Sequence, residues 1–136
     1  MPLGSGGRRG ARERALELLY ESELKERPPS AVLAELAVPP ASYAAELVQG
    51  VEAHFAAVDE LISRYAIDWT LERMPVVDRS LLRMATYELV YRPDVPTGAV
   101  ISEAVELAKA YSTDDSGGFV NGVLAAIAHE VRPAPD

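Results

Sequence analysis

Residues 97–131 read TGAVISEAVELAKAYSTDDSGGFVNGVLAAIAHEV, and this stretch decides the fold class. Apolar residues recur at three- and four-residue steps on both sides of a polar loop at residues 112–118. That spacing is typical of amphipathic helices, each of which buries one face. The pattern therefore predicts two consecutive helices, over about residues 97–111 and 117–131.

The loop between these helices carries more polar and aromatic side chains than a turn requires. Asp114 and Asp115 precede two glycines, and Phe119 lies on the first turn of the next helix. In one interpretation Asp115 or Ser116 caps the helix and Phe119 packs into the core. In the other, the loop and Phe119 form part of a binding site.

The rest of the chain is also helical in pattern, since no segment of useful length shows the period-two alternation of a strand. Proline pairs divide it, because proline and the residue before it disfavour a continuing helix. We expect an all-α domain over residues 8–132, with a disordered Gly- and Pro-rich arm at 1–7 and a short tail at 133–136. With the two helices above, about seven elements result; the others are expected near residues 10–25, 30–36, 42–65, 69–73 (a short turn) and 75–91.

Composition excludes several classes of protein. The 136 residues contain no cysteine, and the two histidines, His54 and His129, have no neighbouring ligand at metal-binding spacing, so we expect no metal and no cofactor. Phosphate-loop, dinucleotide and Ser/His/Asp motifs are absent, which argues against an enzyme. There is no apolar run of membrane-spanning length and no signal-peptide pattern, so we expect a cytoplasmic protein without membrane contact.

The charge distribution is uneven. The net charge is -8, yet Arg8, Arg9, Arg12 and Arg14 crowd into one short segment. Such a cluster can neutralise RNA phosphates on an acidic protein, because salt confines each field to ~8–10 Å. The alternative is a solvated arm that binds nothing.

Three segments together resemble the NusB family of transcription antitermination factors. They are VVDRSLLRMATYEL (76–89), DVPTGAVISEAVELAKAYSTDDSGGFVNGVL (94–124) and, less specifically, RRGARERALELLYESEL (8–24). The resemblance implies a compact all-helical fold of two packed sub-bundles and no catalysis. It also implies binding of the boxA element of ribosomal RNA leader transcripts together with NusE, the ribosomal protein S-ten. The resulting RNA polymerase antitermination complex reads through terminators.

The resemblance also implies an RNA-binding site made of Arg8, Arg9, Arg12, Asp115 and Phe119. Arginine contacts phosphates, an aromatic ring stacks on bases, and a carboxylate accepts hydrogen bonds from exocyclic amines. These residues form one surface only if the first and last helices begin side by side. We therefore expect Phe119 to face outward near the arginines.

For NusE, similar family positions are Tyr20, Leu24, Glu72, Asp78 and Arg83. Tyr20 and Leu24 are apolar enough to be core residues instead, a reading that the sequence leaves open for Leu24 in particular. Glu72 and Asp78 suit a basic ribosomal protein, although lone acids are otherwise ordinary solvated residues.

Two departures from the family pattern remove positive charge. Gly10 follows only two arginines where the family often has three basic residues, and Gly118 replaces a basic residue before the phenylalanine. We therefore expect weak RNA affinity without NusE.

One alternative to an RNA-binding factor is a scaffold or homodimer with no RNA affinity of its own. Another is the similar domain fused to ribosomal RNA cytosine methyltransferases, for which a chain ending at Asp136 leaves no room.

Overall fold

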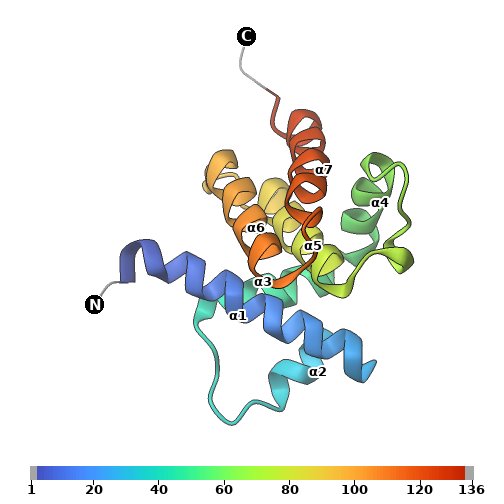
Figure 1. Ribbon diagram of the computed structural model, residues 1–136. Helices are drawn as coiled ribbons and strands as arrows, with labels where there is room; N and C mark the ends of the chain where they lie inside the picture. Colours follow the sequence, from blue (N-terminus) through green and yellow to red (C-terminus); the bar gives the residue numbers. More distant parts are fainter. Residues whose placement is uncertain (1–2, 134–136) are drawn as a thin grey trace.

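The computed structural model describes residues 3–133, all of whose regular structure is helical (Figure 1). The elements are α1 (Leu3–Lys25), α2 (Pro29–Ala34), α3 (Ser42–Ala53), α4 (Phe55–Tyr65), the 3₁₀ turn η1 (Leu71–Arg73), α5 (Val76–Tyr91), α6 (Thr97–Tyr111) and α7 (Ser116–Val131). The prediction of an all-α fold is confirmed. None of the described helices is both long enough and apolar enough to cross a membrane.

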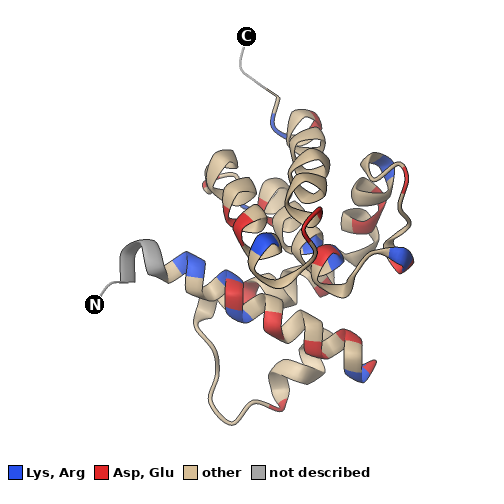
Figure 2. Cartoon of the chain, in the orientation of Figure 1, with Lys and Arg blue, Asp and Glu red and all other residues tan. Residues whose placement is uncertain are grey.

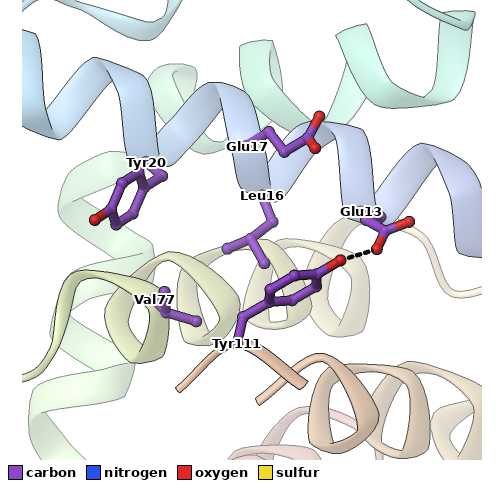
Figure 3. Close-up of a pocket in the computed structure, with 6 residues that line it drawn as sticks. All are labelled: Glu13, Leu16, Glu17, Tyr20, Val77 and Tyr111. Carbon is purple, nitrogen blue, oxygen red and sulfur yellow. Dashed lines mark hydrogen bonds between the residues drawn. The ribbon is translucent and has the colours of Figure 1, made fainter. Parts of the chain in front are cut away.

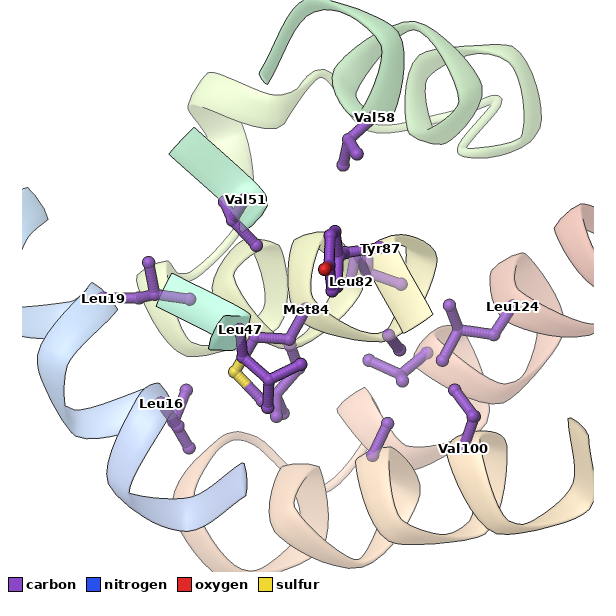
Figure 4. Packing of buried hydrophobic residues seen from close by; sticks show 14 of the residues in the cluster. Leu16, Leu19, Leu47, Val51, Val58, Leu82, Met84, Tyr87, Val100 and Leu124 are labelled. Atoms are coloured by element: carbon purple, nitrogen blue, oxygen red, sulfur yellow. The ribbon is translucent and has the colours of Figure 1, made fainter. Parts of the chain in front are cut away.

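Helix α5 is the central element. It packs against α1 and α3 on one side and against α4, α6 and α7 on the other, so the helices form two sub-bundles that share it. Its buried residues include the unbroken run from Met84 to Leu89, which covers every side of the helix, whereas a helix buried on a single face would have exposed positions in such a run. The side chains around it fill one continuous core (Figure 4).

A close approach between α3 and α5 explains a glycine inside a helix. A Cβ atom at Gly50 would lie 2.2 Å from the Tyr87 ring, far inside van der Waals contact. Glycine normally weakens a helix interior, so its presence here follows from packing.

The prediction of a single helix over residues 42–65 is wrong. The chain breaks at His54, whose backbone (φ -121°, ψ 24°) is not helical, and α4 begins at the next residue. The apolar stripe continues through the break at three- and four-residue steps, from Val51 to Phe55 and Val58. Periodicity alone therefore gives no sign of the change in direction. The His54 ring stacks on Tyr91, with ring centroids 3.9 Å apart.

The start of α1 also differs from expectation. Residues 3–7 extend the helix, where the sequence predicted a disordered arm over 1–7; residues 1–2 and 134–136 lie outside the described part. Each residue added to an existing helix gains a hydrogen bond at the entropy cost of a single residue, so a poor helix-forming segment can continue a good one.

Arg132 ties the end of α7 to the α5–α6 connection. Its guanidinium donates to the carbonyl oxygens of Leu89 (2.9 Å), Arg92 (2.6 Å) and Val95 (2.6 Å). It also donates to the backbone oxygen of Glu88 at 3.1 Å and to a hydroxyl at the start of α6. The last carbonyls of a helix have no partner within it, and this side chain supplies one.

Candidate nucleic-acid interface

The first half of α1 contacts α6 at two points. Arg9 Nε donates to Glu103 Oε1 at 3.1 Å in the middle of α6, and the Tyr111 hydroxyl at its end donates to Glu13 (Figure 3). The contact points are four residues apart on α1 and eight residues apart on α6, so α1 crosses α6 instead of following it. This contact decides how far the arginines lie from the α6–α7 loop, residues 112–115.

Arg8 and Arg9 are on the surface, as predicted. Their side chains are 45% and 58% exposed, and each pairs with one carboxylate: Arg8 with Asp94 at 3.6 Å and Arg9 with Glu103. The Arg8 guanidinium also lies over the Tyr43 ring, 5.4 Å from its centroid. Exposed ion pairs of this kind are worth 1 kcal/mol or less, so both cations remain accessible to phosphate.

Arg12 is not on the surface, contrary to the expectation that it lies in an exposed RNA-binding site. Its side chain is 5% exposed and faces the core, where it donates through Nε and Nη2 to Glu88 at 2.9 and 2.8 Å. The Tyr43 hydroxyl donates to the same carboxylate at 2.5 Å. Burial lowers the pKa of Arg12, but the hydrogen bond and charge of Glu88 outweigh it and raise that pKa overall.

Hydrogen bonds to the buried carboxylate of Asp78 fix the α6–α7 loop. This carboxylate is buried and accepts hydrogen bonds from Ser112 and, at 2.8 Å, from Ser116. The Ser116 hydroxyl also lies 3.3 Å from the backbone nitrogen of Thr113, which donates to it. Asp78 is therefore not a surface residue, contrary to the expectation for a partner-binding acid. The residue shapes the loop instead.

Asp115 and Phe119 remain accessible at the start of α7. Asp115 occupies the N-cap position, yet its exposed side chain makes no capping hydrogen bond, so the capping interpretation fails for it. Phe119 is half-buried, and its ring meets the exposed Trp69 ring edge to face, with centroids 6.5 Å apart.

The two halves of the expected RNA site are not brought together. Glu103, beside Arg9, and Tyr111, before the loop, are eight residues apart, or about 12 Å along α6. The loop lies over the middle of α1 and not at its start (Figure 1). The expected juxtaposition of the two helix N-termini is wrong. The arginines and Phe119 instead mark the ends of a longer surface.

The predicted partner residues have different environments. Tyr20 is 39% and Leu24 62% exposed, so the alternative that Leu24 is a core residue is wrong. Glu72 is exposed, as expected. Arg83 is only 15% exposed because it pairs with Asp59 at 2.8 Å.

A groove adjoins Tyr20 (Figure 3). It has a volume of about 290 Å³, an apolar floor and an acidic rim. The lining residues are Glu13, Leu16, Glu17, Tyr20, Val77 and Tyr111. Tyr111, at the end of α6, is half-exposed, which no local sequence pattern indicates.

Charge is segregated along α1. Arginines occupy the half nearer its N-terminus, and carboxylates dominate toward its C-terminus (Figure 2). Within residues 3–133, no group of three or more His, Asp and Glu side chains is arranged to hold a metal ion.

The helical fold, with arginines and exposed aromatic rings along one surface, defines a helical binding module. The NusB family model matches residues 9–129, and the chain belongs to the NusB family. This is a family of RNA-binding transcription antitermination factors and not of enzymes.

Relatives and solved structures agree. The transcription antitermination protein NusB of Salinispora arenicola is 51% identical over 128 residues, covering 89% of this chain and 94% of that protein. The corresponding protein of Thermobifida fusca is 47% identical over 126 residues, covering 90% and 89%. The structure of T. maritima NusB superposes with a TM-score of 0.84 at 38% identity, covering 93% of each chain. A structure described as antitermination factors NusB and NusE in complex with dsRNA matches with a TM-score of 0.77 at 31% identity, covering 90% and 96%.

Proposed function

We propose that the chain binds the boxA element of ribosomal RNA leader transcripts jointly with NusE. In this proposal it acts in the cytoplasm, within the RNA polymerase complex that reads through terminators. The observation that carries the proposal is the exposed pair Arg8 and Arg9 at one end of a surface that Phe119 and Asp115 complete at the other. A relative's structure with NusE and RNA supports it.

The RNA side of the proposal assigns different tasks to the two ends. Arg8 and Arg9 hold phosphates, since their weak surface ion pairs exchange readily for an RNA phosphate. Phe119 offers part of its ring for stacking, and Asp115 has a free carboxylate to accept from a base amine. An RNA that spans both ends must be extended, which favours single strands.

The NusE side of the proposal uses the C-terminal half of α1. Tyr20 and Leu24 expose apolar surface there, and the carboxylates around them suit a basic ribosomal protein. Glu72 extends this acidic surface, while Arg83 contributes through its ion pair with Asp59, which fixes α4 to α5. Asp78 makes no direct contact with NusE in this proposal.

The net charge of -8 makes NusE important for affinity. Only a few cations face the RNA, and acidic residues elsewhere repel it over the distance of the Debye length. A basic partner bound beside them adds the missing positive charge.

Gel-shift titration of boxA RNA, with and without NusE, tests the proposal. We expect tight binding only with NusE and at least a tenfold loss for an Arg8→Gln/Arg9→Gln double variant. Arg14→Gln is the matched control, because Arg14 is exposed on the same helix and pairs with Glu17. Equal binding by all three proteins would overturn the assignment.

A second candidate function is that of a homodimer whose interface covers the RNA-binding surface. The apolar floor of the groove beside Tyr20 and Tyr111 favours it, since such a floor gains by being covered. Light scattering with and without boxA RNA distinguishes the two, because a dimer that occludes the RNA site dissociates as RNA binds.

A further inference from the structure

The aromatic corner, which we define as Trp69 and Phe119, is an unusual surface feature. Trp69 is the only tryptophan in the chain and is 46% exposed. Its ring meets Phe119 at an interplanar angle of 63°, so the two rings form two sides of a corner. Large aromatic rings left partly in water, with faces free, are the features on which nucleobases stack.

The corner opens into a cleft of about 160 Å³. Both rings line it, together with Met74, Pro75, Asp78, Thr113, Asp115 and Ser116. Asp78 and Ser116 already bond to each other, at 2.8 Å. Asp115 has no side-chain hydrogen bond within residues 3–133, so a free acceptor lies at the edge of an apolar cleft.

Two cations without a partner in the described residues come from the elements next to this corner, Arg73 from η1 and Lys109 from the end of α6. Every other Lys and Arg in the described part of the chain bonds a carboxylate or backbone carbonyls, whereas Arg73 and Lys109 do neither. Arg73 is exposed and lines a second hollow with Trp69. Lys109 is exposed at the end of α6, and its Cγ packs 3.2 Å from the Cβ position of Gly117 in the first turn of α7.

We propose that one RNA base stacks in the aromatic corner while Arg73 and Lys109 hold the phosphates on either side of it. The inference rests on the proposed RNA function and adds Trp69, Arg73 and Lys109 to its binding residues. Asp115 then accepts from the exocyclic amine of the base, which favours adenine, cytosine or guanine over uracil.

The proposal accounts for how an acidic loop binds RNA. The base, which is neutral, enters the cleft beside Asp115, and the charged backbone stays at the flanks where the cations lie. Gly118 brings no charge to the position before Phe119. Lys109, packed against Gly117 in the same turn, brings a positive charge from the neighbouring helix.

Trp69 is its own reporter, so the unmodified protein tests the first half of the proposal. Fluorescently labelled boxA RNA is titrated into the protein–NusE complex while RNA anisotropy and tryptophan emission are both followed. The same complex with Trp69→Phe supplies the blank. We expect Trp69 emission to be quenched and shielded from acrylamide with the same midpoint as the anisotropy change.

An anisotropy change without a Trp69 response would overturn the aromatic corner and leave the proposed function standing. Absence of any anisotropy change would overturn the proposed function, and the corner with it. Trp69→Ala should weaken RNA binding by about fivefold or more, and Trp69→Phe should restore most of it. Ile67→Ala, a change of an exposed apolar residue in the same segment, should bind RNA like the wild type.

The salt dependence of binding tests the two cations. Each phosphate contact to a single strand contributes ~0.7 to the slope of log K against log[salt]. Lys109→Gln and Arg73→Gln should each lower that slope by about this amount, and Lys109→Arg and Arg73→Lys should keep it. An unchanged slope in both Gln variants would overturn their role.

Discussion

Arg12 and Glu88 form a buried, two-pronged ion pair between α1 and α5, with Arg12 Nη2 2.8 Å from Glu88 Oε2. Arg12 lies one helical turn after Arg8 and Arg9. The pair therefore holds in place the part of α1 that presents these arginines to solvent. Tyr43, bonded to the same carboxylate, links α3 to this contact.

Removing one partner of this pair should destabilise the fold strongly. Arg12→Met leaves the Glu88 carboxylate buried without its cation, and we expect a loss of about 3–5 kcal/mol in the free energy of unfolding. Arg12→Met/Glu88→Leu, which removes both charges, should recover most of that loss. Urea unfolding measures both variants. A double variant as unstable as the single one would show that the unpaired charge is not the cause.

Arg132 should stabilise the connection between α5 and α6. Arg132→Met removes a cation from the carboxyl end of α5 and several charge-assisted hydrogen bonds, and we expect a loss of about 2 kcal/mol. Arg132→Lys keeps the charge but lacks the planar guanidinium, so its stability should lie between those of the wild type and the Met variant. Thermal unfolding followed by circular dichroism provides the comparison. Equal stability of the Met variant and the wild type would contradict this role.

Tyr87 should make stability depend on alkaline pH. Burial and a hydrogen bond to Glu46 raise the pKa of Tyr87 to about 12, above its value of about 10 in an unfolded chain. The folded state therefore favours the protonated form. This contribution is complete below pH ~10 and is lost as the pH rises toward 12. Tyr87→Phe should remove it, so urea midpoints of the variant should fall less steeply across that interval. Parallel curves for the two proteins would refute the assignment.

Glu103 should compete with RNA for Arg9. Glu103→Gln frees the Arg9 guanidinium from its ion pair, and we expect binding of boxA RNA to the NusE complex to tighten by about twofold to fivefold. Glu106→Gln is the matched control, since it removes the same charge from an exposed position on the same helix. Anisotropy titrations at one salt concentration decide the question. If both variants tighten binding equally, net charge and not the ion pair is responsible.

Prolines and apolar periodicity predicted the helices well wherever the helix ends seen in the structure coincide with these local patterns. Pro75 and Pro96 mark the starts of α5 and α6, and apolar steps of three and four residues mark the extent of α5, α6 and α7. The break at His54 was missed because the stripe continues in register through it.

The site was harder to predict because its chemistry depends on contacts distant in sequence. Nothing in the local sequence distinguishes Arg12 from the other arginines of its segment. Arg12 is buried because it pairs with Glu88, which lies 76 positions away. Asp78 similarly accepts from Ser112 in the α6–α7 loop and from Ser116 at the start of α7, 34 and 38 positions later. No local pattern distinguishes such residues from the solvated ones beside them. Trp69 was missed because the sequence does not show that its ring is exposed.

The salt dependence of boxA RNA binding tests the central claim most directly. It is measured on the NusE complex for the wild type and for Arg8→Gln/Arg9→Gln. If both arginines hold phosphates, the slope of log K against log[salt] falls by about 1.4 in the double variant, and Arg14→Gln keeps the wild-type slope. The same slope in all three proteins would contradict the claim that the N-terminal arginines bind the RNA backbone.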